Sequence, residues 1–239
     1  MQPSHIKLAV IIPAFNEQDS IAIVVNDINA LSISNTEITA IVINDCSSDN
    51  TSEVVSKLDC ILIDLAVNLG IGGAVQTGYR YAYDNNFDFA IQVDGDGQHP
   101  ANEIPKLLNE AITNNINVVI GSRFIDNKGF QSSGIRRLGI GFLNKLIKLF
   151  TGLNILDNTS GFRLFDKKVL EVVQANYPDE YPEPESLILF SKKNFSIKEV
   201  AVEMKERQGG ESSIRNFDQL YYMIKVSMAI FYTFIKTKK

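Results

Sequence analysis

Short apolar runs alternate with helical patterns through the first half of the chain. The runs are four to six residues long and rich in β-branched side chains, which is typical of buried strands. They are Lys7–Ile12, Ala40–Asn44, Cys60–Leu65, Phe89–Val93 and Val118–Gly121, and the helical patterns between them are Asp19–Ala30, Asn50–Lys57, Gly73–Asn85 and Asn102–Asn114. This alternation predicts an α/β fold with a mostly parallel central sheet covered by helices on both faces.

The second half is less regular. A helical stretch at Ser133–Leu153 is followed by a short turn and strand at Thr159–Phe165. Further helices are predicted at Lys167–Ala175 and Pro184–Lys193, a strand at Ser196–Met204, and a terminal helix at Phe217–Lys236. No linker divides the chain, so we expect one domain over residues 1–212 and a C-terminal apolar or amphipathic helix over residues 213–239.

Charge and composition narrow the classes of protein. The net charge of −5 argues against a nucleic-acid binder, which normally carries a basic excess. Two cysteines make no disulfide framework, which favours a reducing cytosol. The first apolar run, Leu8–Ile12, is too short for a signal peptide, and no run reaches the roughly 18–20 residues of a spanning helix. We therefore expect a soluble or peripheral protein.

Four loops follow predicted strands and carry polar residues or glycines. In parallel α/β sheets, ligands lie beyond the carboxyl ends of the strands, so these loops should gather at one edge. They are Pro13–Glu17, Asp45–Thr51, Asn68–Gly73 and Asp94–His99.

The last loop has the residues of a metal site. Asp94 and Asp96 are one residue apart, and two close carboxylates repel each other unless a cation lies between them. Oxygen ligands suit Mg²⁺ or Mn²⁺, and Gln98 or His99 could add a ligand or a phosphate contact. An ordinary turn rich in aspartate and glycine is the alternative.

The loop at Asn68–Gly73 leads into a helix and could offer backbone N–H groups to an anion. It matches neither the dinucleotide-binding glycine pattern nor the phosphate-binding loop of nucleotide triphosphatases, and a simple strand-to-helix turn is the alternative. Asp45 could accept hydrogen bonds from a ribose or a base, or it could cap a helix.

Seven motifs in order suggest a family. They are Val10-Ile-Ile-Pro-Ala-Phe-Asn-Glu17, Ile43-Asn-Asp-Cys-Ser-Ser-Asp-Asn-Thr51, Asn68–Ala74, Val93-Asp-Gly-Asp-Gly-Gln-His-Pro100, Gly121-Ser-Arg-Phe124, Asp157-Asn-Thr-Ser-Gly-Phe-Arg163 and Arg207-Gln-Gly-Gly-Glu-Ser-Ser213. Together they resemble glycosyltransferase family 2, the inverting enzymes of the GT-A fold. The later motifs resemble the branch with dolichol-phosphate mannosyltransferase and bacterial polyprenyl-phosphate sugar transferases.

Three segments differ from that branch. Asp94-Gly-Asp-Gly replaces the more usual Asp-Ala-Asp-Leu, Ser212-Ser213 replaces Ser-Lys, and Tyr181-Pro-Glu-Pro-Glu185 differs from the usual acidic segment. The last of these and Arg207-Gln-Gly-Gly are more similar to small bacterial enzymes of cell-surface (cell wall) polysaccharide synthesis. Some of those use a UDP-sugar and charge undecaprenyl phosphate with the help of a small membrane protein.

The resemblance implies metal-dependent, inverting sugar transfer from a nucleoside-diphosphate sugar, with a UDP-sugar favoured, to a polyprenyl phosphate. It implies Mg²⁺ or Mn²⁺ on Asp94, Asp96 and Gln98. The catalytic candidates are Asp96, Arg163, Arg207 and Glu185. Expected nucleotide-sugar contacts are Pro13, Phe15, Glu17, Asp45, Gly70, Gly73 and Asp94, and expected acceptor or phosphate contacts are Arg123, Arg137, Ser160, Arg163, Arg207 and Ser212.

The acceptor decides whether a base is needed. A lipid phosphate is ionised at neutral pH and needs cations, for which guanidinium groups are suited, although a surface salt bridge is the default role of any one arginine. A sugar hydroxyl would instead need a carboxylate base, and Glu183 or Glu185 is the candidate. These two could equally be the acidic first turn of a helix.

Two segments could contact a membrane or the helix of a membrane partner. Ser133–Leu153 combines basic and apolar residues, although a core helix explains it equally well. Phe217–Lys239 has an apolar face that is wide for a surface helix. We therefore expect a cytoplasmic protein, peripheral at the inner face of the cell membrane, and a homo-oligomer stays compatible with the sequence.

Other classes fit less well. A nucleotidyltransferase would open with a glycine-rich basic loop, which Pro13–Glu17 is not, and an NAD-binding protein would have glycines there. A non-catalytic sugar-nucleotide binding protein remains the alternative from a different class.

Overall fold

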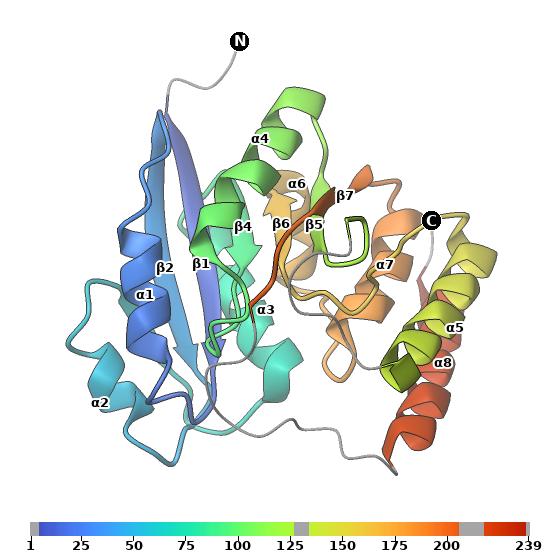
Figure 1. The fold of residues 1–239 in the computed structure, drawn as a ribbon, viewed down its shortest axis with the longest axis horizontal. Helices are drawn as coiled ribbons and strands as arrows, with labels where there is room; N and C mark the ends of the chain where they lie inside the picture. The colour runs from blue at the N-terminus through green and yellow to red at the C-terminus, as the bar shows by residue number, and fades with distance from the viewer. Residues whose placement is uncertain (1–4, 127–133, 206–217, 238–239) are drawn as a thin grey trace.

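The residues that the structure describes form a seven-stranded sheet in the order β3-β2-β1-β4-β6-β5-β7 (Figure 1). The structure is a computed structural model and describes residues 5–126, 134–205 and 218–237. The strands are β1 (Ile6–Ala14), β2 (Thr36–Asn44), β3 (Ile61–Asp64), β4 (Phe89–Gln92), β5 (Val118–Ser122), β6 (Arg163–Asp166) and β7 (Ile197–Ala201).

The sheet is mostly parallel, as the sequence predicts. β1 pairs in parallel with β2 and β4, β2 pairs so with β3, and β5 pairs so with β7. The exception is β6, which is antiparallel to both of its neighbours, β4 and β5. This strand joins the two parallel parts of the sheet and brings the turn before it to the edge where β4 ends.

Helices cover both faces of the sheet. They are α1 (Ile21–Asn29), α2 (Thr51–Val55), α3 (Gly70–Asp84), α4 (Ile104–Asn114), α5 (Gly134–Thr151), α6 (Lys167–Val173), α7 (Pro182–Lys192) and α8 (Asp218–Lys236), with a short 3₁₀ turn η1 (Ala101–Glu103) before α4. Both faces of β1 are buried, which explains its continuous apolar sequence. Val10 belongs to the core with α1, α2 and α4, and Ile11 to the core with α3 and α5–α8.

The last helix packs on the rest of the fold. α8 contacts α7 and α5, and its Val226 and Ile230 are fully buried in the same core as α3 and α7. Figure 1 shows α5 and α8 side by side at one end of the molecule. The expected boundary near residue 213 falls outside the described residues. No helix among the described residues is long and apolar enough to cross a membrane.

Candidate functional site

The first two strand-end loops are bonded to each other, as expected. The Asn16 backbone N–H donates to Ser47 Oγ at 3.0 Å, and the Asn16 side chain accepts from the Ser48 N–H at 2.8 Å. Asn16 has a positive φ of 56°, a conformation that asparagine tolerates well. One residue further along the first loop, the Glu17 N–H donates to Thr51 Oγ1 in the second loop at 2.9 Å. The two loops therefore form one platform at the carboxyl edge of the sheet.

The Asp45 carboxylate caps the start of α3. One of its oxygens accepts from the Leu69 N–H at 2.7 Å and the other from the Gly70 N–H at 2.9 Å, and the residue is only 4% exposed. The helix-cap alternative is therefore the role that the structure shows, although the helix is α3 and not the one that follows Asp45. Because two N–H groups already bind this carboxylate, the loop at Asn68–Gly73 has fewer donors left for a ligand anion.

The glycines of this loop have local structural reasons. Gly70 has a φ of +75°, which favours glycine. A Cβ atom on Gly73 would lie 2.6 Å from the Leu69 Cβ, so only glycine fits there without a shift. These contacts explain both residues without a nucleotide.

Of the remaining expected nucleotide contacts, Phe15 is the most accessible, with half of its surface exposed beside buried Pro13. Glu17 is partly buried, and Ser20 Oγ donates to its carboxylate at 2.9 Å. The carboxylate is thus oriented at the start of α1, next to the platform.

Two side chains hold Asp94 in place, and the sequence alone indicated this role for neither of them. Gln92 Nε2 donates to Asp94 Oδ1 at 3.0 Å, and His99 Nε2 lies 3.7 Å from Asp94 Oδ2. The His99 Nδ1 accepts from the Asp94 backbone N–H at 3.0 Å, which places the ring proton on Nε2, on the side of the carboxylate. The Asp94 side chain keeps 33% of its surface exposed, so it is oriented and still reachable.

Asp96 lies deeper in the same loop and is 7% exposed. Its Oδ1 accepts from the Gln98 N–H at 3.0 Å, which closes the loop on itself. The Gln98 carbonyl in turn accepts from the Lys205 N–H at 3.0 Å, so the segment after β7 also braces the loop. Both carboxylates therefore belong to one fixed loop at the end of β4.

The turn before β6 (residues 156–162) packs against the acidic loop (residues 94–99). The His99 ring stacks on Phe162, with 5.0 Å between centroids and 17° between planes. A Cβ atom on Gly161 would lie 2.7 Å from Gln92 Nε2 and 3.5 Å from Asp94 Oδ1. The absence of a side chain at Gly161 therefore keeps room for the contact that orients Asp94.

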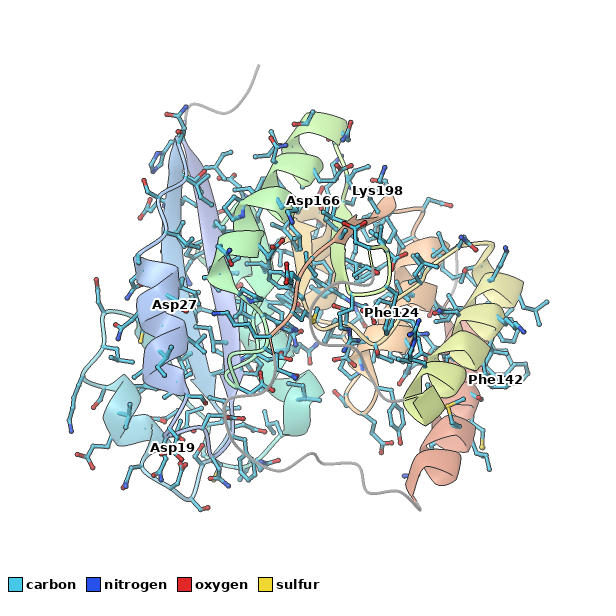
Figure 2. The ribbon with its side chains drawn as sticks, viewed as in Figure 1. Asp19, Asp27, Phe124, Phe142, Asp166 and Lys198 are labelled. Atoms are coloured by element: carbon cyan, nitrogen blue, oxygen red, sulfur yellow. The ribbon has the colours of Figure 1, made fainter. Side chains whose placement is uncertain are left out.

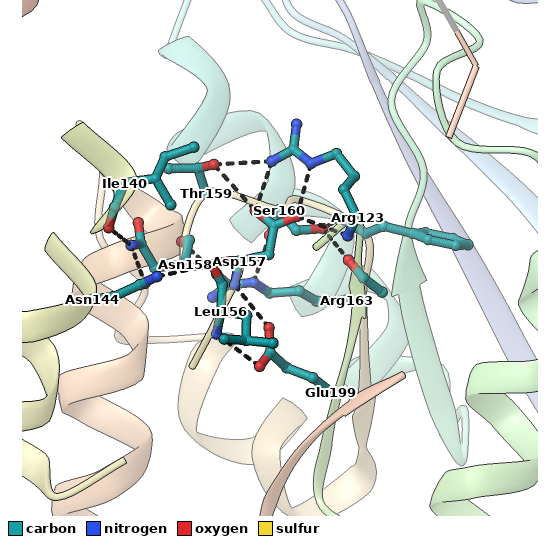
Figure 3. A network of polar contacts seen from close by, with 12 residues as sticks. Arg123, Ile140, Asn144, Leu156, Asp157, Asn158, Thr159, Ser160, Arg163 and Glu199 are labelled. Atoms are coloured by element: carbon teal, nitrogen blue, oxygen red, sulfur yellow. Dashed lines mark hydrogen bonds and ion pairs between the residues drawn. The ribbon is translucent and has the colours of Figure 1, made fainter. Parts of the chain in front are cut away.

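Arg123 is bound inside this turn (Figure 3). Its guanidinium makes two parallel 2.7 Å bonds to the Asp157 carboxylate and a 3.0 Å bond to Thr159 Oγ1. Glu199 accepts from the backbone N–H groups of Leu156 and Asp157, each at 2.8 Å. Arg123 is 8% exposed and its fork is engaged by the turn, so its expected contact with an acceptor phosphate stays a prediction.

Arg163 is fully buried and also serves the turn. It donates to the backbone carbonyls of Ser160 and Asn158 at 2.7 and 2.9 Å. Its Nη1 donates to the Glu183 carbonyl at 2.7 Å and to Ser186 Oγ at 2.9 Å. The guanidinium therefore ties the turn to the start of α7, which explains its burial better than phosphate binding does.

The two candidate bases lie in different surroundings. Burial raises the pKa of Glu183, the Arg163 guanidinium opposes that rise, and the negative charge of Asp94 adds to it. Burial also raises the pKa of Glu185, but its carboxylate accepts a 2.8 Å bond from Thr233 on α8. Glu183 is therefore within electrostatic range of the acidic loop, whereas Glu185 is engaged by the terminal helix.

The other expected acceptor contacts are Ser160, Arg137, Arg207 and Ser212. Ser160 is buried and donates to the Gly121 carbonyl, so it too secures the turn. Arg137 is exposed near the start of α5, with its guanidinium 5.5 Å from the centre of the Phe124 ring. Arg207 and Ser212 lie outside the described residues.

A family model identifies this arrangement. The model described as glycosyl transferase family 2 matches residues 9–173 of the chain. The chain belongs to glycosyl transferase family 2. It is a glycosyltransferase, and its sheet and helices have the GT-A fold of its structural neighbours.

Relatives of this family 2 glycosyltransferase match most of its length. A UDP-N-acetylglucosamine–dolichyl-phosphate N-acetylglucosaminyltransferase from Methanococcus voltae is 31% identical over 215 residues, 80% of this chain and 83% of the relative. A polyprenol monophosphomannose synthase from Mycolicibacterium smegmatis is 25% identical over 228 residues, 91% of this chain and 84% of the relative. Glucosyl-3-phosphoglycerate synthase from Mycobacterium tuberculosis, crystallised with Mn²⁺, UDP-glucose and phosphoglyceric acid, superposes with a TM-score of 0.70 at 19% identity, covering 98% of this chain and 81% of that one.

Sequence reasoning on this glycosyltransferase missed the residues that orient others. Gln92 follows an apolar run as an isolated amide, and that position was the signal for a partner of Asp94. Glu199 gave no such signal, because it lies far along the chain from the turn that it holds.

Proposed function

We propose that this enzyme transfers a sugar from a nucleoside-diphosphate sugar, with a UDP-sugar favoured, to a polyprenyl phosphate with inversion at the anomeric carbon. It would act as a peripheral enzyme at the cytoplasmic face of the membrane, in the synthesis of cell-surface glycans. The observation that carries the proposal is the acidic loop, which holds Asp94 and Asp96 at the carboxyl edge of the sheet. Two relatives support the acceptor class, because their names contain dolichyl-phosphate and polyprenol monophosphomannose.

The acidic loop fits a Mg²⁺ or Mn²⁺ ion that is shared with substrate. Among the described residues, no three His, Cys, Asp or Glu side chains gather to hold a metal alone. At phosphate sites, Mg²⁺ is usually bound by one or two carboxylates, and water and the substrate phosphates complete its coordination. Asp94 and Asp96 would hold the ion, with Gln98 next to them. The metal would supply positive charge to the leaving nucleoside diphosphate.

The nucleoside would lie on the platform of the first two loops. The exposed ring of Phe15 offers a face to a base, and Glu17 lies next to it. Asp45 contributes by fixing the start of α3, since its two oxygens are engaged there. Pro13, Gly70 and Gly73 shape the backbone of the same edge.

A phosphate acceptor needs cations near the acidic loop, because it must approach another phosphate group. Among the residues that the structure describes, Arg137 is the candidate cation, because it is exposed near the start of α5 beside Phe124. Arg207 and Ser212 stay in the proposal from the sequence alone. Arg123, Ser160 and Arg163 hold the turn that positions the acidic loop.

A second candidate function is transfer to a sugar hydroxyl, and one observation favours it. The pKa of Glu183 is raised by burial, within electrostatic range of Asp94, and a carboxylate with a raised pKa is suited to accept a proton. A phosphate acceptor has no such requirement. The role of Glu183 therefore separates the two functions.

The test is release of nucleoside diphosphate from UDP- and GDP-sugars with Mg²⁺ or Mn²⁺, with and without undecaprenyl phosphate in detergent. We expect lipid-dependent release that chelation abolishes, and a loss of at least about a hundredfold in Asp96→Asn because the leaving group loses its charge stabilisation. Asp84→Asn, at an exposed carboxylate near the far end of α3, is the matched control and should retain full activity.

The same assay with Glu183→Gln and Glu185→Gln distinguishes the acceptors. Lipid-dependent turnover that survives in Glu183→Gln supports a phosphate acceptor. Turnover on a glycan acceptor that is lost in Glu183→Gln and retained in Glu185→Gln supports a hydroxyl acceptor. Failure to bind any sugar nucleotide would overturn the enzymatic proposal.

A further inference from the structure

An apolar surface that no part of the described chain covers runs along α8. Among the side chains of this helix that the structure describes, five large apolar or aromatic ones are each more than half exposed: Ile224, Met228, Phe231, Tyr232 and Ile235. Their spacing of four, three, one and three residues places them in one stripe of the helix. The opposite side of α8 holds Val226 and Ile230, which are fully buried. The helix is therefore apolar on two sides, and the core explains only one of them.

Helix α5 extends this surface. Phe142 and Leu149 are seven residues apart on one side of α5 and are 52% and 77% exposed. Figure 2 shows Phe142 at the outer side of the molecule. Phe150 joins the two helices, with its ring centroid 6.1 Å from that of Phe231 and 4.9 Å from that of Phe234. The exposed side chains of both helices form what we call the α5–α8 face.

The charges on α5 and α8 are mostly positive. α5 contains four basic residues and no acidic one, and α8 contains two basic residues and one acidic one. The whole chain, by contrast, has 23 basic and 28 acidic residues. Lys145 and Lys148 lie on α5 beside the exposed stripe, and Lys236 lies 5.7 Å from the ring of Tyr232 on α8. Lysines that flank an apolar stripe, with tyrosine at its margin, are typical of helices that lie in a lipid headgroup region.

Helix α5, which carries part of this face, also contacts the candidate site through its buried side. Near the start of α5, Arg137 contacts Phe124, the residue after Arg123. One turn later, the Ile140 carbonyl accepts from the Asn158 side chain at 3.1 Å (Figure 3). Asn158 belongs to the turn that packs on the acidic loop. The helix that carries part of the face is thus bonded to the turn that braces the acidic loop.

We propose that the α5–α8 face docks the enzyme on a bilayer that contains anionic lipid. The apolar stripe enters the acyl boundary, and the flanking lysines meet lipid phosphates. Docking rests on the proposed function and deepens it, because it would hold the enzyme at the membrane that contains a lipid-borne acceptor.

Vesicle flotation tests the proposal. The full chain is mixed with phosphatidylcholine vesicles that contain or lack 30% phosphatidylglycerol, without any donor sugar. We expect flotation with the anionic vesicles, and a loss of at least about tenfold in Met228→Glu/Ile235→Glu because two charges would enter the acyl boundary. Lys145→Gln/Lys148→Gln should weaken flotation at low salt and less so at high salt, since salt screens this attraction.

Ile23→Glu is the matched control. Ile23 is 48% exposed on α1, on the other face of the sheet, so its substitution should leave flotation intact. Thermal unfolding of each variant separates loss of docking from loss of fold. Flotation that Met228→Glu/Ile235→Glu does not change overturns the proposal, as does a folded wild-type chain that never floats. Concentration-dependent dimerisation abolished by the same pair, without flotation, would assign the face to a second copy instead.

The outcome is independent of turnover. Asp96→Asn should float like wild type, although its release of nucleoside diphosphate should fall at least about a hundredfold. Failure of the docking proposal would therefore leave lipid-dependent transfer in detergent untouched, and failure of transfer would leave flotation untouched.

Discussion

Arg123 and Arg163 show how one residue type is accommodated in two ways. Arg123 is buried against a carboxylate, with two 2.7 Å bonds to Asp157. Arg163 is buried against neutral acceptors, three of them backbone carbonyls. A motif that contains arginine indicates phosphate binding only when the guanidinium faces the ligand, and here both face the interior. Their contribution to the site is to hold a turn in place.

Removal of the Asp157 charge should therefore destabilise the protein. In Asp157→Asn, Arg123 would remain buried without its carboxylate, which typically costs about 3–5 kcal/mol of unfolding free energy. Urea denaturation measures this loss. Glu53→Gln removes an exposed carboxylate that pairs with Lys57 and should leave the urea midpoint unchanged. Similar midpoints for Asp157→Asn and wild type would show that the turn does not depend on the pair.

At the scale of elements, local sequence was sufficient for most of the fold. β1 and α4 were predictable because apolar periodicity reflects burial on faces that the element itself defines. The antiparallel direction of β6 was not, because a four-residue strand takes its direction from distant partners, β4 and β5. The start of α3 at Gly70, three residues before the predicted Gly73, depends on backbone N–H groups that donate to Asp45. In the site, the acidic loop followed from its spacing, whereas the burial of Arg163 depends on α7.

Two glycines allow a test of how the turn supports the acidic loop. A Cβ atom in Gly161→Ala would displace the end of the flexible Gln92 side chain, so Asp94 would lose its 3.0 Å partner at little cost in stability. We expect activity to fall at least about tenfold, in line with a lost supporting hydrogen bond. Gly141→Ala on α5 meets no atom within 4 Å and should raise stability by about 0.5–1 kcal/mol. Nucleoside-diphosphate release and urea denaturation measure the two effects. Full activity in Gly161→Ala would contradict the supporting role of Gln92.

At the scale of the whole molecule, α8 belongs to the folded unit. Its inner side shares a core with α3 and α7, so a truncation before Asp218 would uncover apolar side chains of α5 and α7. Such a truncation would remove a layer of the fold together with the α5–α8 face. Point substitutions on the outer side of α8 are therefore the cleaner probe of docking.

A pair of isoleucines on α8 tests this division. Ile230 is fully buried, so Ile230→Ala should lower the unfolding free energy by about 2–5 kcal/mol through lost burial and a residual cavity. Ile235 is 64% exposed, so Ile235→Ala should change stability little. Equal and small effects in denaturant titrations would mean that α8 is an appendage and not a layer of the domain.

The place of β6 also affects the order in which the chain can fold during synthesis. β5 bonds to β6 and β7, both of which leave the ribosome after it. Until residue 166 has emerged, the nascent chain therefore carries an unpaired β5 and an open edge on β4, and such edges invite association with other chains. The acidic loop at the end of β4 likewise remains without the turn that braces it. The part of the sheet formed by β4, β6 and β5 can thus become protease-resistant only late in translation, although β1 is made at the start.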